Sequence, residues 1–348
     1  MAGSEHLMFA EEVTLGTWLT PDKAIPVRTV SLTGSQPLML TDETGGGRNS
    51  RPGSVGQIGA TGTITTLLHP TVLPFLLRSV FATRAKAVAG TGFRNKLLID
   101  DDVAFNTFSI QKRYTGTLAE SLRGCKINTF TIGAVTKEFA TCSIDMVGKD
   151  STVTPGGTWS DAITAPAVVD PVPYEATYVE PFKFYQGVLR LGGAVTLTAG
   201  ELVVVGGTER VDLDNIDITA NFNVGTDAYG INLGDRTVQT LDEGRREITV
   251  KFDPNFNSTG SEFYNAWKAG ARAVIELYFK GPEFDLTAHK AYEMKITLPW
   301  VVYSNGANPE LNATYGLKRH TVEGTAFVDP TTDCDIGIVI QGPEDLTL

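Results

Sequence analysis

Apolar and polar residues alternate along several stretches of this chain, and this is the pattern of β-strands with one buried and one solvated face. In residues 216–224, Ile, Ala, Phe and Val alternate with Asp, Thr and Asn, and the same period runs through 248–252 and 142–146. We therefore expect antiparallel strands there. Recurrent clusters of Val, Ile, Thr and Phe favour β structure over the chain as a whole.

Two stretches depart from this alternation and predict helices. Residues 71–83 are apolar over a broad face and predict a short helix. Residues 257–270 predict a second helix, because Thr259 and Glu262 have the spacing of a capping box and Gly270 is a suitable C-terminal stop.

The order of these features repeats along the chain at an offset of 183 to 187 residues. A strand followed by a helix occurs once in each half, and the matched segments agree in expected structure and order but hardly in identity. A near-constant offset over several elements indicates a duplicated unit. The matched pairs are 61–70 with 245–254, 29–40 with 215–226, 104–115 with 291–304, and 137–148 with 320–331.

A proline-rich stretch separates the two halves. Residues 150–178 contain Pro155, Pro166, Pro171 and Pro173, which stiffen the chain and disfavour a central strand. We interpret this stretch as an extended linker. The expected organisation is a first domain over 1–149, a linker over 150–178 and a second domain over 179–348. Each domain is mainly β, a sandwich or barrel of antiparallel strands with one flanking helix.

The charge of the chain is acidic and unevenly placed. The net charge is −11, yet residues 1–170 contain 15 basic and 15 acidic residues, whereas 171–348 contain 14 basic and 25 acidic ones. Such a protein is poorly suited to holding nucleic acid, because phosphate contacts need basic side chains. An acidic surface suits instead a path along which nucleic acid moves without being retained.

The cysteines and the N-terminus give expectations about the compartment. Cys125, Cys142 and Cys334 form no CxxC pair, and an odd number is a poor disulfide framework, so a reducing compartment is expected. The N-terminus lacks the pattern of a signal peptide. No apolar run approaches the roughly 20 residues that a membrane-spanning helix needs.

The glycine-rich stretch 44–62 raises the question of a phosphate-binding loop. It contains two arginines but no lysine, so it lacks the pattern of a P-loop. The residues after Gly62 predict a strand, whereas a dinucleotide-binding loop opens a helix. We interpret the stretch as a long surface loop rather than a nucleotide site.

Catalytic and metal-binding patterns are also missing from the sequence. Neither an HExxH nor a GxSxG motif occurs, and no histidine or other base accompanies a cysteine as an activating partner. The acidic run 100–102 lacks EF-hand spacing and is better interpreted as a solvated turn than as a cation site. We expect no enzyme activity, cofactor or metal. The scattered histidines, which we expect to be structural or at the surface, are His6, His69, His289 and His320.

Four segments of the first half resemble a known family. They are EEVTLGTWLTPDKAIPVRTVSL (11–32), FSIQKRYTG (108–116), GCKINTFTI (124–132) and KEFATCSIDMVGK (137–149). These segments are similar to those of major tail tube proteins of long-tailed, non-contractile bacteriophages. The resemblance covers most of residues 9–149. The second half matches by duplication and order of elements.

The resemblance implies a structural virion protein of the phage tail, assembled in the host cytoplasm. Members of the family fold as a β-sandwich-like barrel with a flanking helix and a long loop, and they form rings that stack into a tube. The implied partners are further copies of the chain, the tape measure protein, and the tail terminator and tail tip proteins. The resemblance also implies that genome DNA passes through the lumen without specific binding and that no membrane is involved.

The duplication changes the expected ring. If each chain supplies two tube domains, three chains make a pseudo-hexameric ring, with a true hexamer as the alternative. Strand 215–226 is a candidate for the lumen, although an outer solvated face fits its alternation equally well. The loop 44–62 is expected to reach a neighbouring ring. The residues singled out are Asp217, Thr219, Asn221 and Asn223 for the lumen, and Arg48, Arg51, Gly53, Gly56 and Gly59 for the loop.

Two other classes of protein stay open at this point. One is a β-sandwich module that binds carbohydrate or acts in adhesion on a virion or cell surface, for which exposed aromatic residues would have to gather on loops. Trp18, Trp159 and Tyr315 are far apart in the sequence. The other is a β-rich hydrolase with paired carboxylates contributed by distant positions.

Overall fold

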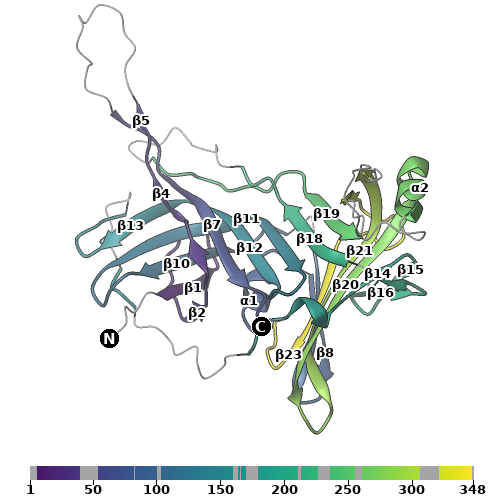
Figure 1. The fold of residues 1–348 in the computed structure, drawn as a ribbon. Helices are drawn as coiled ribbons and strands as arrows, with labels where there is room; N and C mark the ends of the chain where they lie inside the picture. The colour runs from purple at the N-terminus through teal and green to yellow at the C-terminus, as the bar shows by residue number, and fades with distance from the viewer. Residues whose placement is uncertain are drawn as a thin grey trace, which may run out of the picture.

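The chain is mainly β, as expected, with long antiparallel strands and two α-helices among the described residues (Figure 1). The computed structural model describes residues 6–39, 54–81, 83–99, 103–159, 164, 166–169, 179–210, 213–225, 236–254, 261–305 and 321–346. The helices are α1 (Leu73–Leu77) and α2 (Ser261–Ala269), and a 3₁₀ turn spans Phe184–Gln186.

The strands fall into two groups along the chain. Those of the first half are β1 (His6–Glu12), β2 (Lys23–Ile25), β3 (Thr29–Val30), β4 (Thr33–Ser35), β5 (Leu38–Met39), β6 (Ser54–Val55), β7 (Gly59–Leu67), β8 (Thr83–Ala89), β9 (Gly92–Leu98), β10 (Thr107–Arg113), β11 (Ala119–Val135), β12 (Thr141–Gly148) and β13 (Asp150–Thr154). Those of the second half are β14 (Gly187–Leu191), β15 (Ala194–Thr198), β16 (Glu201–Val205), β17 (Thr208–Arg210), β18 (Leu213–Asn221), β19 (Glu247–Pro254), β20 (Arg272–Asp285), β21 (Lys290–Asn305), β22 (Val322–Ala326) and β23 (Gly337–Gly342).

One sheet runs through both halves of the molecule and is here called the central sheet. Its order is β3/β4, β7, β12, β11, β18, β19, β22 and β21, so each half supplies four neighbouring positions. All of these pairings are antiparallel. Alternation therefore gives the sheet one apolar face and one polar face.

The seam between the halves is the pairing of β11 with β18. Phe130 lies opposite Ala220 and Ile132 opposite Ile218, and all four side chains are buried. The apolar face is thus continuous across the seam. Apolar surface buried here stabilises the joined halves, at about 25 cal/mol for each Å² removed from water.

The pairing order of the first half recurs in the second. Outside the central sheet, β11 continues to β13 on one side and to β10, β1 and β2 on the other. In the second half β21 continues to β23 on one side and to β20, β14 and β17 on the other. One of the matched pairs was wrong: 104–115 contains β10, whose counterpart in pairing order is β20, whereas 291–304 lies in β21. The two strands of the β20–β21 hairpin show similar alternation, so alternation alone does not tell which of them corresponds to β10.

Among the described residues, the hairpin of β8 and β9 has no counterpart at the same place in the second half, where α2 is followed directly by β20. It belongs to the first half in sequence, but β9 pairs with β23, so it extends a sheet of the second half. Arg94 of β9 places its guanidinium 2.7 Å from Glu201 of β16, and Lys295 of β21 lies 2.5 Å from the same carboxylate. Ion pairs and backbone pairing therefore tie the two halves together at this hairpin.

The helices confirm the two sequence predictions in outline. All five residues of α1 are buried against the core. Phe263 anchors α2, because its ring lies 5.3 Å from that of Phe252 and 5.9 Å from that of Tyr303. Gly270 ends α2 with φ +58° and donates its amide to the Trp267 carbonyl, as a C-terminal glycine does. Thr259 lies outside the described residues.

The stretch interpreted as a linker begins with a strand. Asp150–Thr154 forms β13 and pairs with the first residues of β11, so a linker would begin after Thr154. The Asp150 carboxylate lies 3.1 Å from Arg123, whose guanidinium lies 4.6 Å from the ring of Trp159. Trp18 and Trp159 are far apart in the sequence, but their ring centroids lie 5.7 Å from each other.

Candidate functional site

The polar face of the central sheet is rich in hydroxyl groups. Side chains bond across neighbouring strands: the Thr63 hydroxyl donates to Asp145 at 2.5 Å, and the Thr131 and Thr219 hydroxyls lie 2.9 Å apart. These residues alternate with the core positions. Further polar members of this face include Thr61, Thr65, Thr129, Thr141, Ser143, Asp217, Asn221, Glu247, Thr249, Lys251, Asp253, Glu323 and Thr325.

Carboxylates outnumber ammonium groups on this face. Among the polar members named above, five are acidic and one is basic, and Lys251 lies 3.2 Å from Glu323. Burial raises the pKa of the Asp217 carboxyl, Lys251 opposes the rise and Asp253 adds to it. The face therefore presents a negative, hydroxyl-lined surface.

A glycine makes room for Asp217 at the seam. Gly133 lies directly opposite Asp217 in the pair of β11 and β18, and a Cβ at Gly133 would lie 2.4 Å from the Asp217 Oδ1 atom. Next to the seam the face is hollowed by a depression of about 440 Å³, lined by Thr131, Asp217 and Lys251 among others.

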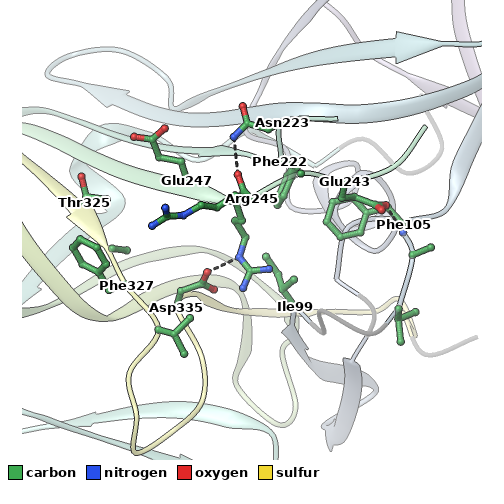
Figure 2. Close-up of a pocket in the computed structure, with 16 residues that line it drawn as sticks. Ile99, Phe105, Phe222, Asn223, Glu243, Arg245, Glu247, Thr325, Phe327 and Asp335 are labelled. Atoms are coloured by element: carbon green, nitrogen blue, oxygen red, sulfur yellow. Dashed lines mark hydrogen bonds and ion pairs between the residues drawn. The ribbon is translucent and has the colours of Figure 1, made fainter. Parts of the chain in front are cut away.

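Three of the four residues predicted for one face lie there together. Asp217, Thr219 and Asn221 occupy alternate positions of β18. Asn223 does not join them, because β18 ends at Asn221 and Asn223 adopts φ +48°. Its side-chain amide donates to the Arg245 carbonyl at 2.6 Å (Figure 2).

Sequence reasoning missed the members of this face in the first half. The alternation that identified 142–146 also contained Ser143 and Asp145, so that signal was present. Pairing is what brings these residues to the same face as β18, since β12 and β11 lie between β7 and β18. A single sequence does not give this pairing.

The described part of the glycine-rich stretch 44–62 begins in a two-stranded stem. Arg48, Arg51 and Gly53 lie outside the described residues. Strands β5 and β6 form the stem, and the Gly56 amide donates to the Pro37 carbonyl at 2.7 Å. Gly59 pairs with Ser35 at the start of β7. The stem exposes apolar side chains, namely Leu38, Met39 and Val55.

A groove of about 880 Å³ lies beside the ends of β18 and β22 (Figure 2). Its lining includes Phe105 and Phe222, whose rings lie 4.8 Å apart, and an ion pair of Arg246 with Asp335. Phe327 lies at the groove and is almost half exposed. The groove therefore combines aromatic and charged surface where the second half meets first-half residues such as Phe105.

Comparison with known families assigns the chain. The family model of the phage tail tube protein matches residues 4–310. The chain belongs to this family. A search of curated proteins gave no match. A tail tube protein is a structural component of the virion tail and self-assembles into a tube, and the resemblance found in the first half is confirmed at this level.

Two cysteines and a histidine of this tail tube protein are buried in its core. Burial raises the pKa of the Cys125 thiol well above its usual range and that of Cys142 to about 12, so both thiols stay protonated in the core. His69 is buried, with Nδ1 3.0 Å from the Val179 carbonyl. Within the described ranges, no three His, Cys, Asp or Glu side chains gather to hold a metal ion. No described helix is long and apolar enough to span a membrane.

Proposed function

We propose that three chains form a closed ring and that stacked rings make the tail tube through which the genome passes. The observation that carries this proposal is the repeated pairing order, in which each half places four strands in one continuous sheet. On this basis each chain is two tandem copies of the tail tube fold, and a ring of three has pseudo-sixfold symmetry.

The two edges of the central sheet would meet between neighbouring chains. At one edge of the sheet, β3 pairs with β7 on one side. At the other edge, β20 pairs with β21 as far as Val302, so the edge proposed to meet the next chain begins after Val302. Inside the chain, the equivalent junction is the pairing of β11 with β18. A ring that repeats this junction between chains removes the sheet edges, which are otherwise a liability for aggregation.

The proposed ring has the right width for DNA. Three chains supply 3 × 8 = 24 strand positions. At about 4.8 Å between strands and a tilt of about 40°, the backbone diameter is roughly 48 Å. Side chains narrow this channel but leave space for a DNA duplex. Such a tube fits the siphophage type of tail.

The mass of isolated rings tests the proposed stoichiometry. With a chain of 37.4 kDa, a ring of three has a mass of 3 × 37.4 = 112 kDa. Native mass spectrometry of rings, or the symmetry of a reconstructed tube, measures it. Six chains per ring with true sixfold symmetry would overturn the proposal.

The polar face of the central sheet would line the lumen. Its carboxylates repel phosphate, so DNA slides without being trapped. We expect the double variant Thr61→Lys with Glu247→Lys to retain DNA in assembled tubes, with binding that weakens steeply as salt rises. Both positions are exposed on this face. The readout is DNA that co-sediments with tubes across a salt series.

A matched control for the lumen carries the same charge change elsewhere. Glu283→Lys with Thr287→Lys alters exposed residues near the turn between β20 and β21, away from the polar face. This control is expected to leave DNA retention at the wild-type level. Equal retention by both double variants would show that the polar face does not meet DNA.

The loop 44–62 would reach the next ring along the tube. Arg48 and Arg51 would pair there with carboxylates of the acidic second half, and the glycines would permit a demanding backbone path. Removal of residues 45–53 keeps the stem and is expected to give rings that do not stack. Electron microscopy measures this outcome, and tubes of normal length would contradict it.

A further inference from the structure

A connection in the second half lies across the first half of the same chain. Residues 222–246 join β18 to β19, and the described parts of this connection, 222–225 and 236–246, contact the first half at several points. The Glu243 carboxylate lies 2.6 Å from the Lys126 ammonium and accepts the Phe105 amide at 2.8 Å. The Ile58 amide donates to the Arg236 carbonyl at 2.8 Å. We call this connection the strap, because it runs from the second half of the chain onto the first half.

The arm of the first half occupies the equivalent place in the pairing order. Residues 36–58 join β4 to β7 as 222–246 join β18 to β19. In the proposed ring, the first half of one chain lies next to the second half of the neighbouring chain. If the arm lies across its neighbour as the strap does, it therefore contacts that second half. The surface that would receive it is found from the positions that the strap contacts in the first half.

Those positions correspond to an exposed apolar surface in the second half. Lys126, which the strap contacts, pairs with Val147 across β11 and β12. At the equivalent place, the Phe327 amide donates to the Trp300 carbonyl across β21 and β22. Val147 is 8% exposed, whereas Phe327 and its neighbour Val328 are each 46% exposed. The buried pair of Lys126 and Val147 in the first half thus has a more exposed counterpart in the second half.

The stem of the arm has the apolar side chains to cover this surface. Leu38 is 62% exposed and Val55 is 50% exposed, although both lie in paired strands. On the receiving surface, Arg272 stacks 5.2 Å from the Trp300 ring and lies 3.1 Å from the Asp329 carboxylate. This surface is therefore held in shape before docking, which lowers the entropic cost of association.

The stem cannot reach this surface within its own chain. The stem adjoins β4 and β7 at one edge of the central sheet, whereas Phe327 follows β22, which lies next to the opposite edge strand β21. Several strands at about 4.8 Å each separate the two edges, a distance of roughly 30 Å. In a closed ring, by contrast, the first edge of one chain meets the last edge of the next.

We propose that the stem formed by β5 and β6 packs on the Phe327 and Val328 surface of the neighbouring chain in the same ring. This inference rests on the proposed ring. In this proposal the stem makes contacts within a ring, whereas the residues between β5 and β6 make the contacts between rings proposed above. The partner is a second copy of this chain, bound through apolar side chains.

Cross-linking of paired cysteines tests the contact. The background is Cys334→Ser, because Cys334 is half-buried whereas Cys125 and Cys142 are buried. Val55→Cys with Val328→Cys is treated with a short bismaleimide after assembly. We expect covalent species that end at the number of chains in one ring, seen on a denaturing gel. Met39→Cys with Val328→Cys provides a second pair and is expected to give the same species.

The control pair uses an exposed position away from the proposed contact. Val88 is exposed in the hairpin of β8 and β9, so Val55→Cys with Val88→Cys is expected to give no linked species. Linkage equal to this control in assembled tubes would overturn the contact. A ladder extending beyond one ring would also overturn it, because the stem would then join different rings. Wild-type protein that forms neither rings nor tubes would defeat the proposed function itself.

Discussion

Replacing Phe222 with alanine is expected to lower the free energy of unfolding by about 3–5 kcal/mol, as for other fully buried phenylalanines. Phe222 is 1% exposed and follows β18 of the second half. Its ring lies 4.8 Å from Phe105 and 5.9 Å from Phe130, which both belong to the first half. The variant therefore removes a core contact at the seam between the halves. Urea denaturation followed by tryptophan fluorescence measures the loss.

Phe327→Ala is the matched control for this loss. Its side chain is almost half exposed and lies outside the buried core, so the change is expected to cost less than about 1 kcal/mol in the isolated chain. The same control is expected to weaken assembly, because Phe327 lies on the proposed receiving surface. If Phe222→Ala cost no more than Phe327→Ala, the aromatic cluster would not hold the seam.

The strands were predictable where one face is buried and the other is polar. Alternation predicted β18, β19 and β12, because each of these strands shows its buried face directly in the sequence. Alternation within a strand does not show which other strand pairs with it. Segment 104–115 was accordingly matched with β21 although its counterpart in the pairing order is β20.

Pairings between distant segments were beyond the sequence. The seam joins β11 to β18, and the hairpin of the first half joins β23 near the end of the chain. Both pairings depend on how whole units pack, since any exposed strand edge can accept another strand. The same limit applies to Trp18 and Trp159, which meet because β13 and the residues after it fold back on the first half.

The candidate site was predictable in part for a related reason. Asp217, Thr219 and Asn221 follow from the alternation of one strand. Asn223 continues the same alternation in sequence, but the strand has ended and the backbone has turned to positive φ. The space that Gly133 leaves for Asp217 could not be predicted from the sequence, because only the pairing of β11 with β18 places the two residues opposite each other.

Replacing Glu201 with glutamine is expected to lower the free energy of unfolding by about 1–2 kcal/mol at pH 7. Burial alone would raise the pKa of this carboxyl, but hydrogen bonds and charge from Arg94 and Lys295 outweigh burial and hold the pKa at about 2. A full conversion of this shift would give a larger loss, and partial solvent access reduces it. Glutamine keeps the size of the side chain and removes its charge.

The loss is expected to depend on pH in a defined direction. An unfolded glutamate has a pKa near 4.3, so the folded pKa of Glu201 lies below the unfolded one. Its contribution is fully present above about pH 5 and is lost as pH falls toward 2. The difference in unfolding free energy between wild type and Glu201→Gln should therefore shrink over this window. Urea denaturation at a series of pH values measures it.

Glu138→Gln supplies the control for this pH series. Glu138 is exposed in the turn between β11 and β12, so its replacement is expected to change stability by less than about 0.5 kcal/mol at any pH. A difference for Glu201→Gln that stayed constant from pH 7 to pH 2 would argue against the ion pairs as its origin. A difference that shrinks as pH falls would show that the ionised Glu201 carboxylate stabilises the folded chain through Arg94, carried by the hairpin of the first half, and Lys295.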